Sequence, residues 1–176
     1  MEEMERIRKA SRRLGMVFKL AVPLTPCIVA LFWLLVEHNR LMQQQLPVVL
    51  DPNLPGMAKV WGFVVSMVPG AVLMYILVQL SRLFRHYEQG HFFTRANVAI
   101  FHRLGWSVLA WAAGDFLHIT GLGIVLTLHR PAGQRLLVVN ITSDQVLVVL
   151  IGLVVLTISW VMDEARKIEE EQALII

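Results

Sequence analysis

Four long stretches of this 176-residue chain carry almost no charge, and this pattern constrains its fold more than any other feature. Three contain no Lys, Arg, Asp or Glu, and the fourth contains one acidic residue, Asp115. Each is close to the roughly 20 residues that a helix needs to cross a hydrocarbon core of about 30 Å. A backbone in lipid must satisfy its own hydrogen bonds, so the stretches are expected to be helical. The sequence therefore predicts an all-α membrane protein.

The composition also indicates a membrane environment. Hydrophobic residues make up 56% of the chain and charged residues 16%, and the mean hydropathy is +0.62, which is more apolar than a soluble domain. The polar connections are too short to bury a core of their own. We expect one domain over 1–176, a four-helix transmembrane bundle. Its transmembrane helices are predicted at about 15–36, 58–81, 105–128 and 145–162.

The basic residues predict the orientation. Eleven of them fall in the N-terminal tail, in the second connection and in the C-terminal tail, whereas four fall in the first and third connections. By the positive-inside rule, both termini, a hairpin over 82–104 and a tail over 163–176 face the cytoplasm. Anchoring to lipid headgroups accounts for this charge, so no direct nucleic-acid binding is expected.

Small residues recur along two of the predicted helices. Gly62, Ser66 and Gly70 follow one another every four residues, and Ala110 and Gly114 form a shorter stripe. Such stripes let helix backbones approach closely in membranes. They predict either packing within the chain or a homodimer.

The hairpin over 82–104 contains helix signals. Gly90 suits a left-handed cap at the end of one helix, and Thr94 is a good N-cap for the next. Phe93, just before that cap, is expected to pack onto Val98. Tyr87 and Phe92 add apolar surface, so this hairpin is a candidate site for partner binding together with Asn97.

On the opposite side, the third connection predicts a small extracytoplasmic hairpin. A turn signal over 129–134 precedes the branched residues of 135–139, which suit a strand. Val48, Val49 and Leu50 of the first connection are expected to complete a small cap.

One pair of residues suggests chemistry inside the membrane. Asp115 lies near the middle of its predicted helix, and His118 lies one turn away on the same face. An ionisable residue at that depth is costly and marks a candidate proton or ion pathway. The alternative is a structural pair that is hydrogen-bonded to Ser66, Thr25 or Thr157. No catalytic motif, metal-ligand spacing or cofactor motif is present, so neither an enzyme nor a bound cofactor is expected.

Two segments resemble a known family. The first is Tyr87-x-x-Gly90-x-x-Phe93-Thr94-x-x-Asn97, followed by Leu104-Gly105. The second is the charged run over 163–171 with the apolar end Leu174-Ile175-Ile176. Both are similar to a bacterial family of four-helix membrane proteins known only as a domain of unknown function. The resemblance implies the bacterial inner membrane and a neighbouring gene for a small cytosolic helix-turn-helix regulator.

The tail after the fourth helix supports two interpretations. Ile168 and the apolar end 174–176 lie near one face, opposite charged residues. The tail either folds back onto the hairpin or offers a docking surface for a partner. We therefore expect a regulatory or accessory membrane protein that acts through a cytosolic or membrane partner. The alternative is a small proton- or ion-coupled transporter, or a subunit of one, that uses Asp115 and His118.

Overall fold

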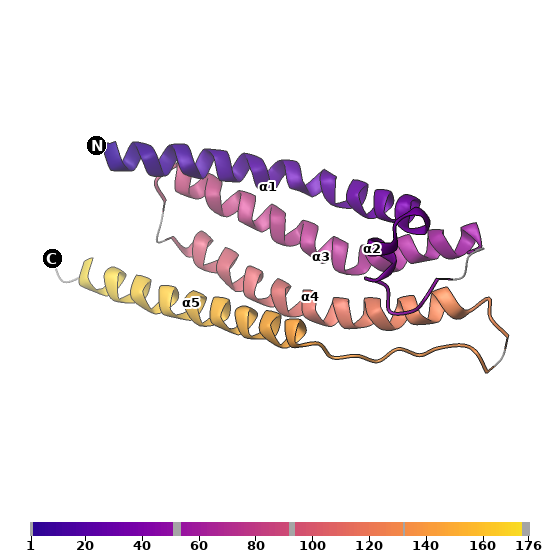
Figure 1. The fold of residues 1–176 in the computed structure, drawn as a ribbon. Helices are drawn as coiled ribbons and strands as arrows, with labels where there is room; N and C mark the ends of the chain where they lie inside the picture. The colour runs from indigo at the N-terminus through magenta and orange to yellow at the C-terminus, as the bar shows by residue number, and fades with distance from the viewer. Residues whose placement is uncertain (1, 51–53, 92–93, 132, 174–176) are drawn as a thin grey trace.

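The computed structural model describes residues 2–50, 54–91, 94–131 and 133–173. Two short elements, η1 (Val36–His38) and α2 (Arg40–Gln43), follow the first of four long helices (Figure 1). The long helices are α1 (Glu2–Leu35), α3 (Gly56–Glu88), α4 (Arg95–Thr127) and α5 (Ser143–Ala173). All four are long and apolar enough to span a membrane, and no strand occurs among the described residues. The predicted all-α, multi-pass fold is confirmed.

The helices extend well beyond the predicted spans. The 33 residues of α3 rise roughly 50 Å, whereas a hydrocarbon core is about 30 Å thick. The residues expected to form an N-terminal tail belong to α1, and the charged run after residue 162 belongs to α5. Both segments are rich in Glu, Lys, Arg and Ala, which favour helix, so each span continues without a break.

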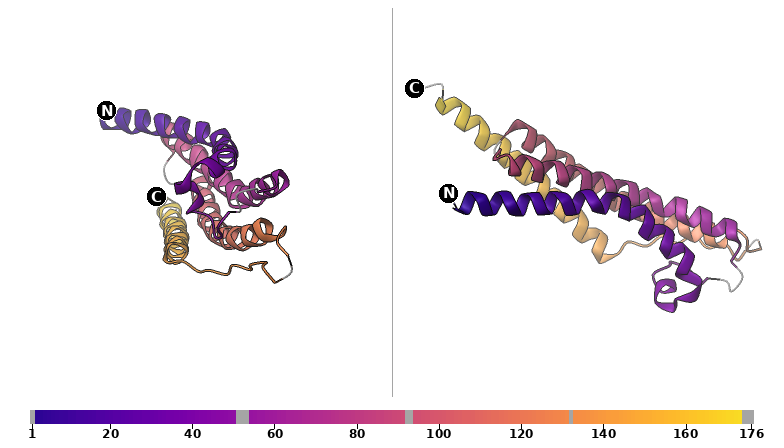
Figure 2. Two further views of the ribbon diagram at one scale, coloured as in Figure 1. Left: turned by 45° about the vertical axis from the view of Figure 1, so that its right-hand side comes forward. Right: turned by 90° about the horizontal axis from the view of Figure 1, so that it is seen from above.

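The four long helices form an open row. They alternate in direction, so both chain ends lie at one end of the molecule, which we call the termini end, opposite the loop end (Figure 1). Extensive contacts join α1 to α3, α3 to α4 and α4 to α5. In the described part of the chain, α5 has no comparable contact with α1 or α3. Helices α1 and α5 therefore form the two edges of the row (Figure 2).

Small residues lie where neighbouring helices approach. Gly62 is buried against the ring of Trp33 on α1, and Gly70 lies beside Thr25. Gly114 of α4 meets the backbone of α3, whereas Ala110, its expected partner in the stripe, is exposed. Gly62, Gly70 and Gly114 thus serve packing within the chain, and homodimerisation stays a prediction.

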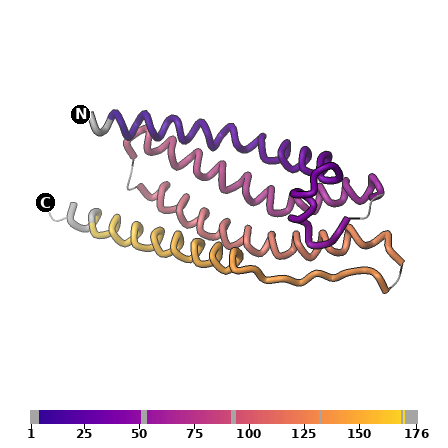
Figure 3. The backbone as a smooth tube through the Cα atoms, viewed as in Figure 1, coloured from indigo at the N-terminus to yellow at the C-terminus, as the bar shows by residue number. Residues whose placement is uncertain are grey.

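The described residues of the loop end form a cap that contains no strand. Val48 and Leu54 of the first connection are buried with Leu122 and Leu126 of α4, while Val49 is exposed. The prediction of a strand over 135–139 is wrong. Residues 134–142 instead run back along α4 as extended chain that pairs with no strand (Figure 3).

Two contacts with α4 explain this course. The Leu136 amide donates to the fully buried Thr127 hydroxyl at 3.0 Å, and Val138 packs over Gly123. The segment therefore packs against a helix and not against a second strand.

The Trp33–Gly62 contact gives a test of the α1–α3 packing. A Cβ atom at Gly62 would overlap the Trp33 ring, so Gly62→Ala is expected to destabilise the protein by about 1–3 kcal/mol. Thermal unfolding in detergent measures the change. Gly56→Ala is the matched control on the same helix, because nothing lies within 4 Å of that position. Equal stability of the two variants would contradict the packing.

Candidate functional site

A polar chain connects all four long helices. The Ser66 hydroxyl of α3 accepts a hydrogen bond from Trp33 Nε1 of α1 at 3.1 Å and lies 3.0 Å from His118 Nε2 of α4. His118 Nδ1 is 3.9 Å from Asp115 Oδ1. Gln145 Nε2 of α5 donates to Asp115 Oδ2 at 3.0 Å. The pair identified from the sequence is thus the centre of a five-residue chain.

The direction of the Trp33–Ser66 bond is fixed, and the tautomer of His118 sets the direction of the next one. An indole N–H only donates, so Ser66 accepts from Trp33 and its own proton is available for His118 Nε2. A neutral His118 that accepts at Nε2 carries its proton on Nδ1, facing Asp115. The 3.9 Å between His118 Nδ1 and Asp115 Oδ1 is too long for a direct hydrogen bond, so the two side chains interact only electrostatically.

Two of the three hydroxyl partners expected for the pair lie elsewhere. Ser66 does contact His118. The Thr25 hydroxyl instead donates to the carbonyl of Ala21, and the Thr157 hydroxyl to that of Leu153, each within its own helix. Such local bonds are always available to a helical threonine, so they compete with bonds between helices.

Trp33 and Gln145 were not identified from the sequence as partners of this pair. Gln145 lies in the first turn of α5, so Asp115 is level with the start of α5 and not with its middle. The available signal was an amide side chain at the boundary of the last apolar stretch. Sequence reasoning counted depth along each helix separately and therefore missed the axial offset between α4 and α5.

A small pocket reaches the polar chain. It has a volume of about 290 Å³, and Ser66 and His118 line it together with Phe32 and Leu122. Gln45 of the first connection also contributes to its wall. The side chains of Asp115 and His118 keep 29% and 22% of their surface exposed, so both titratable groups are only partly enclosed.

At the termini end, Asn97 holds the hairpin between α3 and α4. Its side chain is fully buried; Nδ2 donates to the carbonyl of His91 at 2.7 Å, and Oδ1 lies 2.7 Å from His86 Nδ1. The Thr94 hydroxyl accepts a hydrogen bond from the backbone N–H of Asn97 at 3.3 Å, which confirms Thr94 as the N-cap. Gly90 adopts a φ of 80°, the left-handed geometry expected of it. One amide side chain thereby joins two helix ends and their loop.

This arrangement separates structural from exposed residues among the partner-binding candidates. Asn97 is inaccessible, and Tyr87 packs edge-on against Phe84 with its pKa raised by burial. Ile168 on α5 is 50% exposed. Phe92, Phe93, Leu174, Ile175 and Ile176 lie outside the described residues, and so does the expected contact of Phe93 with Val98.

Charged side chains connect the hairpin to α5. Arg95 Nη2 bonds Glu170 at 3.0 Å, and Arg166 pairs with both Glu170 and Asp163, at 2.7 and 3.0 Å. Hydrogen bonds from Arg95 and Arg166 lower the pKa of Glu170, and those from Arg166 and Lys167 lower the pKa of Asp163. Depressed carboxyl pKa values stabilise this arrangement at neutral pH, and the contribution is lost as the pH falls through the lowered values.

The comparisons agree with the fold. Four apolar helices in alternating directions define a multi-pass membrane protein. A family model described as "Protein of unknown function (DUF2975)" matches residues 38–176, so the chain belongs to this family. The match includes the whole hairpin and all of α5, which confirms the resemblance to an uncharacterised family. No curated protein and no solved structure matches the chain. No group of three His, Cys, Asp or Glu side chains in the described ranges could hold a metal ion.

Ser66 is the testable junction of the polar chain. Ser66→Ala removes the partner of both Trp33 and His118, and hydrogen bonds between membrane helices contribute about 0.6 kcal/mol each. We expect a loss of roughly 1 kcal/mol in thermal unfolding in detergent. Thr157→Ala is the control, because that hydroxyl bonds only its own helix. A loss no greater than the control's would show that the chain does not stabilise the fold.

Proposed function

We propose that this protein is a non-enzymatic regulatory or accessory protein of the bacterial inner membrane. Its hairpin and the extension of α5 beyond residue 162 would bind a cytosolic or membrane partner. The excess of basic residues at the termini end supports a cytoplasmic location for this surface. A small helix-turn-helix regulator, as the family resemblance implies, is one such partner.

The observation that carries this proposal is the link between Arg95 and Glu170. It joins residues 75 positions apart in the sequence, so the hairpin and the α5 extension present one surface. Both side chains remain largely exposed, at 75% and 51%, so they are available to another protein. Ile168 adds an exposed apolar side chain where α5 has left its apolar stretch, on a different face of the helix from Glu170.

Such a surface suits recognition for a physical reason. An exposed apolar residue and fixed charges on the same helical extension provide both a desolvated contact and electrostatic selectivity. The Asn97 hydrogen bonds hold the hairpin in place before any partner binds, which lowers the entropic cost of binding.

Site-specific cross-linking tests the proposal. A photoreactive benzoylphenylalanine at Ile168 is expected to yield an adduct with a second polypeptide in cells. The same residue at Val154, which is 57% exposed in the apolar part of α5, should yield lipid adducts only. Glu170→Arg should reduce the protein adduct, and Arg95→Glu combined with Glu170→Arg should restore part of it. Lipid-only adducts at both positions would refute the docking surface.

The pocket beside His118 supports a second candidate, a proton- or ion-coupled transporter or a subunit of one. Asp115→Asn would then abolish proton flux in proteoliposomes that contain a pH-sensitive dye. The fold should persist, because the Asn oxygen still accepts from Gln145. Asp144→Asn, which removes the acidic residue next to Gln145, is the control and should keep the flux. Unchanged flux in Asp115→Asn, or no flux in the unmodified protein, would exclude this candidate.

A further inference from the structure

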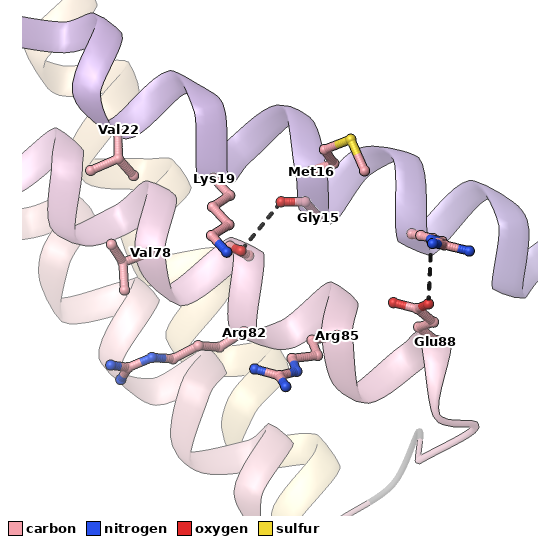
Figure 4. A pocket seen from close by; sticks show the side chains of 10 residues that line it. Gly15, Met16, Lys19, Val22, Val78, Arg82, Arg85 and Glu88 are labelled. Carbon is pink, nitrogen blue, oxygen red and sulfur yellow. Dashed lines mark hydrogen bonds and ion pairs between the residues drawn. The ribbon is translucent and has the colours of Figure 1, made fainter.

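A basic groove lies between α1 and α3 at the termini end (Figure 4). Its volume is about 590 Å³. Lys19 enters it from α1, and Arg82 and Arg85 line it from α3. Val22 and Val78 form its wall on the side toward the middle of the helices.

Three cations of this groove have no counter-ion among the described side chains. Glu88 is the carboxylate among the lining residues, and it lies 3.9 Å from Arg12. Within the described ranges, Lys19, Arg82 and Arg85 make no hydrogen bond or ion pair through their side chains. Three cations around one groove favour an anionic ligand with several acceptor oxygens.

The depth of the groove indicates where that ligand comes from. Lys19 is the last charged residue of α1 before the apolar stretch, and Arg82 is the first charged residue of α3 after its own stretch. The cations therefore lie where the spans meet the headgroup layer. From these cations toward the middle of the helices, the apolar wall of the groove continues into the spans, where an acyl chain would lie in an apolar environment.

The two helices hold the groove in a fixed shape. The Ser81 hydroxyl donates to the Gly15 carbonyl at 3.2 Å, and the rings of Phe18 and Phe84 stack at 5.5 Å. These contacts join α1 to α3 beside the groove and keep the two helices at a constant separation. The binding geometry is therefore present before a ligand arrives, which favours specific over diffuse attraction.

We propose that this groove binds an anionic glycerophospholipid. The phosphate lies among Lys19, Arg82 and Arg85, and an acyl chain follows Val22 and Val78. The site does not include Arg95 or Glu170, whose contact carries the proposed partner surface.

Native mass spectrometry of the full chain in mild detergent tests this site. Dioleoyl phosphatidylglycerol is expected to remain bound where dioleoyl phosphatidylcholine, with the same acyl chains, is lost. Lys19→Gln, Arg82→Gln and Arg85→Gln should each weaken phosphatidylglycerol binding about fivefold, the effect of one basic residue at an anionic surface. Unchanged thermal unfolding without lipid would show that the variants fold.

Arg13→Gln is the matched control, since Arg13 is an exposed cation of α1 that does not line the groove. It should change binding less than twofold. Equal retention of the two lipids, or an equal loss in the control variant, would overturn the proposal in favour of diffuse attraction. Displacement of phosphatidylglycerol by an equal concentration of inorganic phosphate would also overturn it, because a free anion would then suffice.

Discussion

The Ser66 hydroxyl is the point on which the helix row depends most, because it satisfies polar groups from two other helices at once. Lipid offers no hydrogen bonds to replace a lost partner, so the Trp33 indole and the His118 ring each need a protein acceptor or donor. With these bonds in place, α1, α3 and α4 have a common register. Gln145 then attaches α5 to the same chain through Asp115. This line of polar contacts adds to the apolar packing and helps to fix the alignment of the helices in the open row.

The two ends of the row are built by different physics. At the loop end, apolar side chains such as Val48 and Leu126 bury one another beneath irregular chain, and the Thr127 hydroxyl and an Arg130 guanidinium hold that chain in place. At the termini end, Leu83, Ile100 and Leu104 form a second buried apolar cluster, and exposed charged pairs are added at the surface. Arg95 and Glu170 remain in solvent, where their pairing is weak and exchangeable. A surface that must meet a partner is better made from such contacts than from a closed apolar cap.

The sequence predicted the solvent, the number of spans and the local caps, because each depends on composition or on a few neighbouring residues. Gly90 and Thr94 are examples, since a left-handed turn and an N-cap are local requirements. The sequence could not predict the axial offset between α4 and α5 that brings Gln145 to Asp115, because this offset arises from packing between helices. The strand expected over 135–139 failed for the same reason. The branched residues there do favour extended chain, but this chain packs against Thr127 and Gly123 of α4 and not against a second strand.

The residues that carry the family resemblance gain a physical meaning from the hairpin. Gly90, Thr94 and Asn97 are turn, cap and buried bridge, so together they specify the shape of the connection between α3 and α4. A fully buried Asn97 has no surface left to offer a partner, and both the oxygen and the nitrogen of its side-chain amide are hydrogen-bonded. Under the proposed function, recognition would therefore use exposed residues whose identity the hairpin's shape does not dictate, such as Arg95 and Ile168.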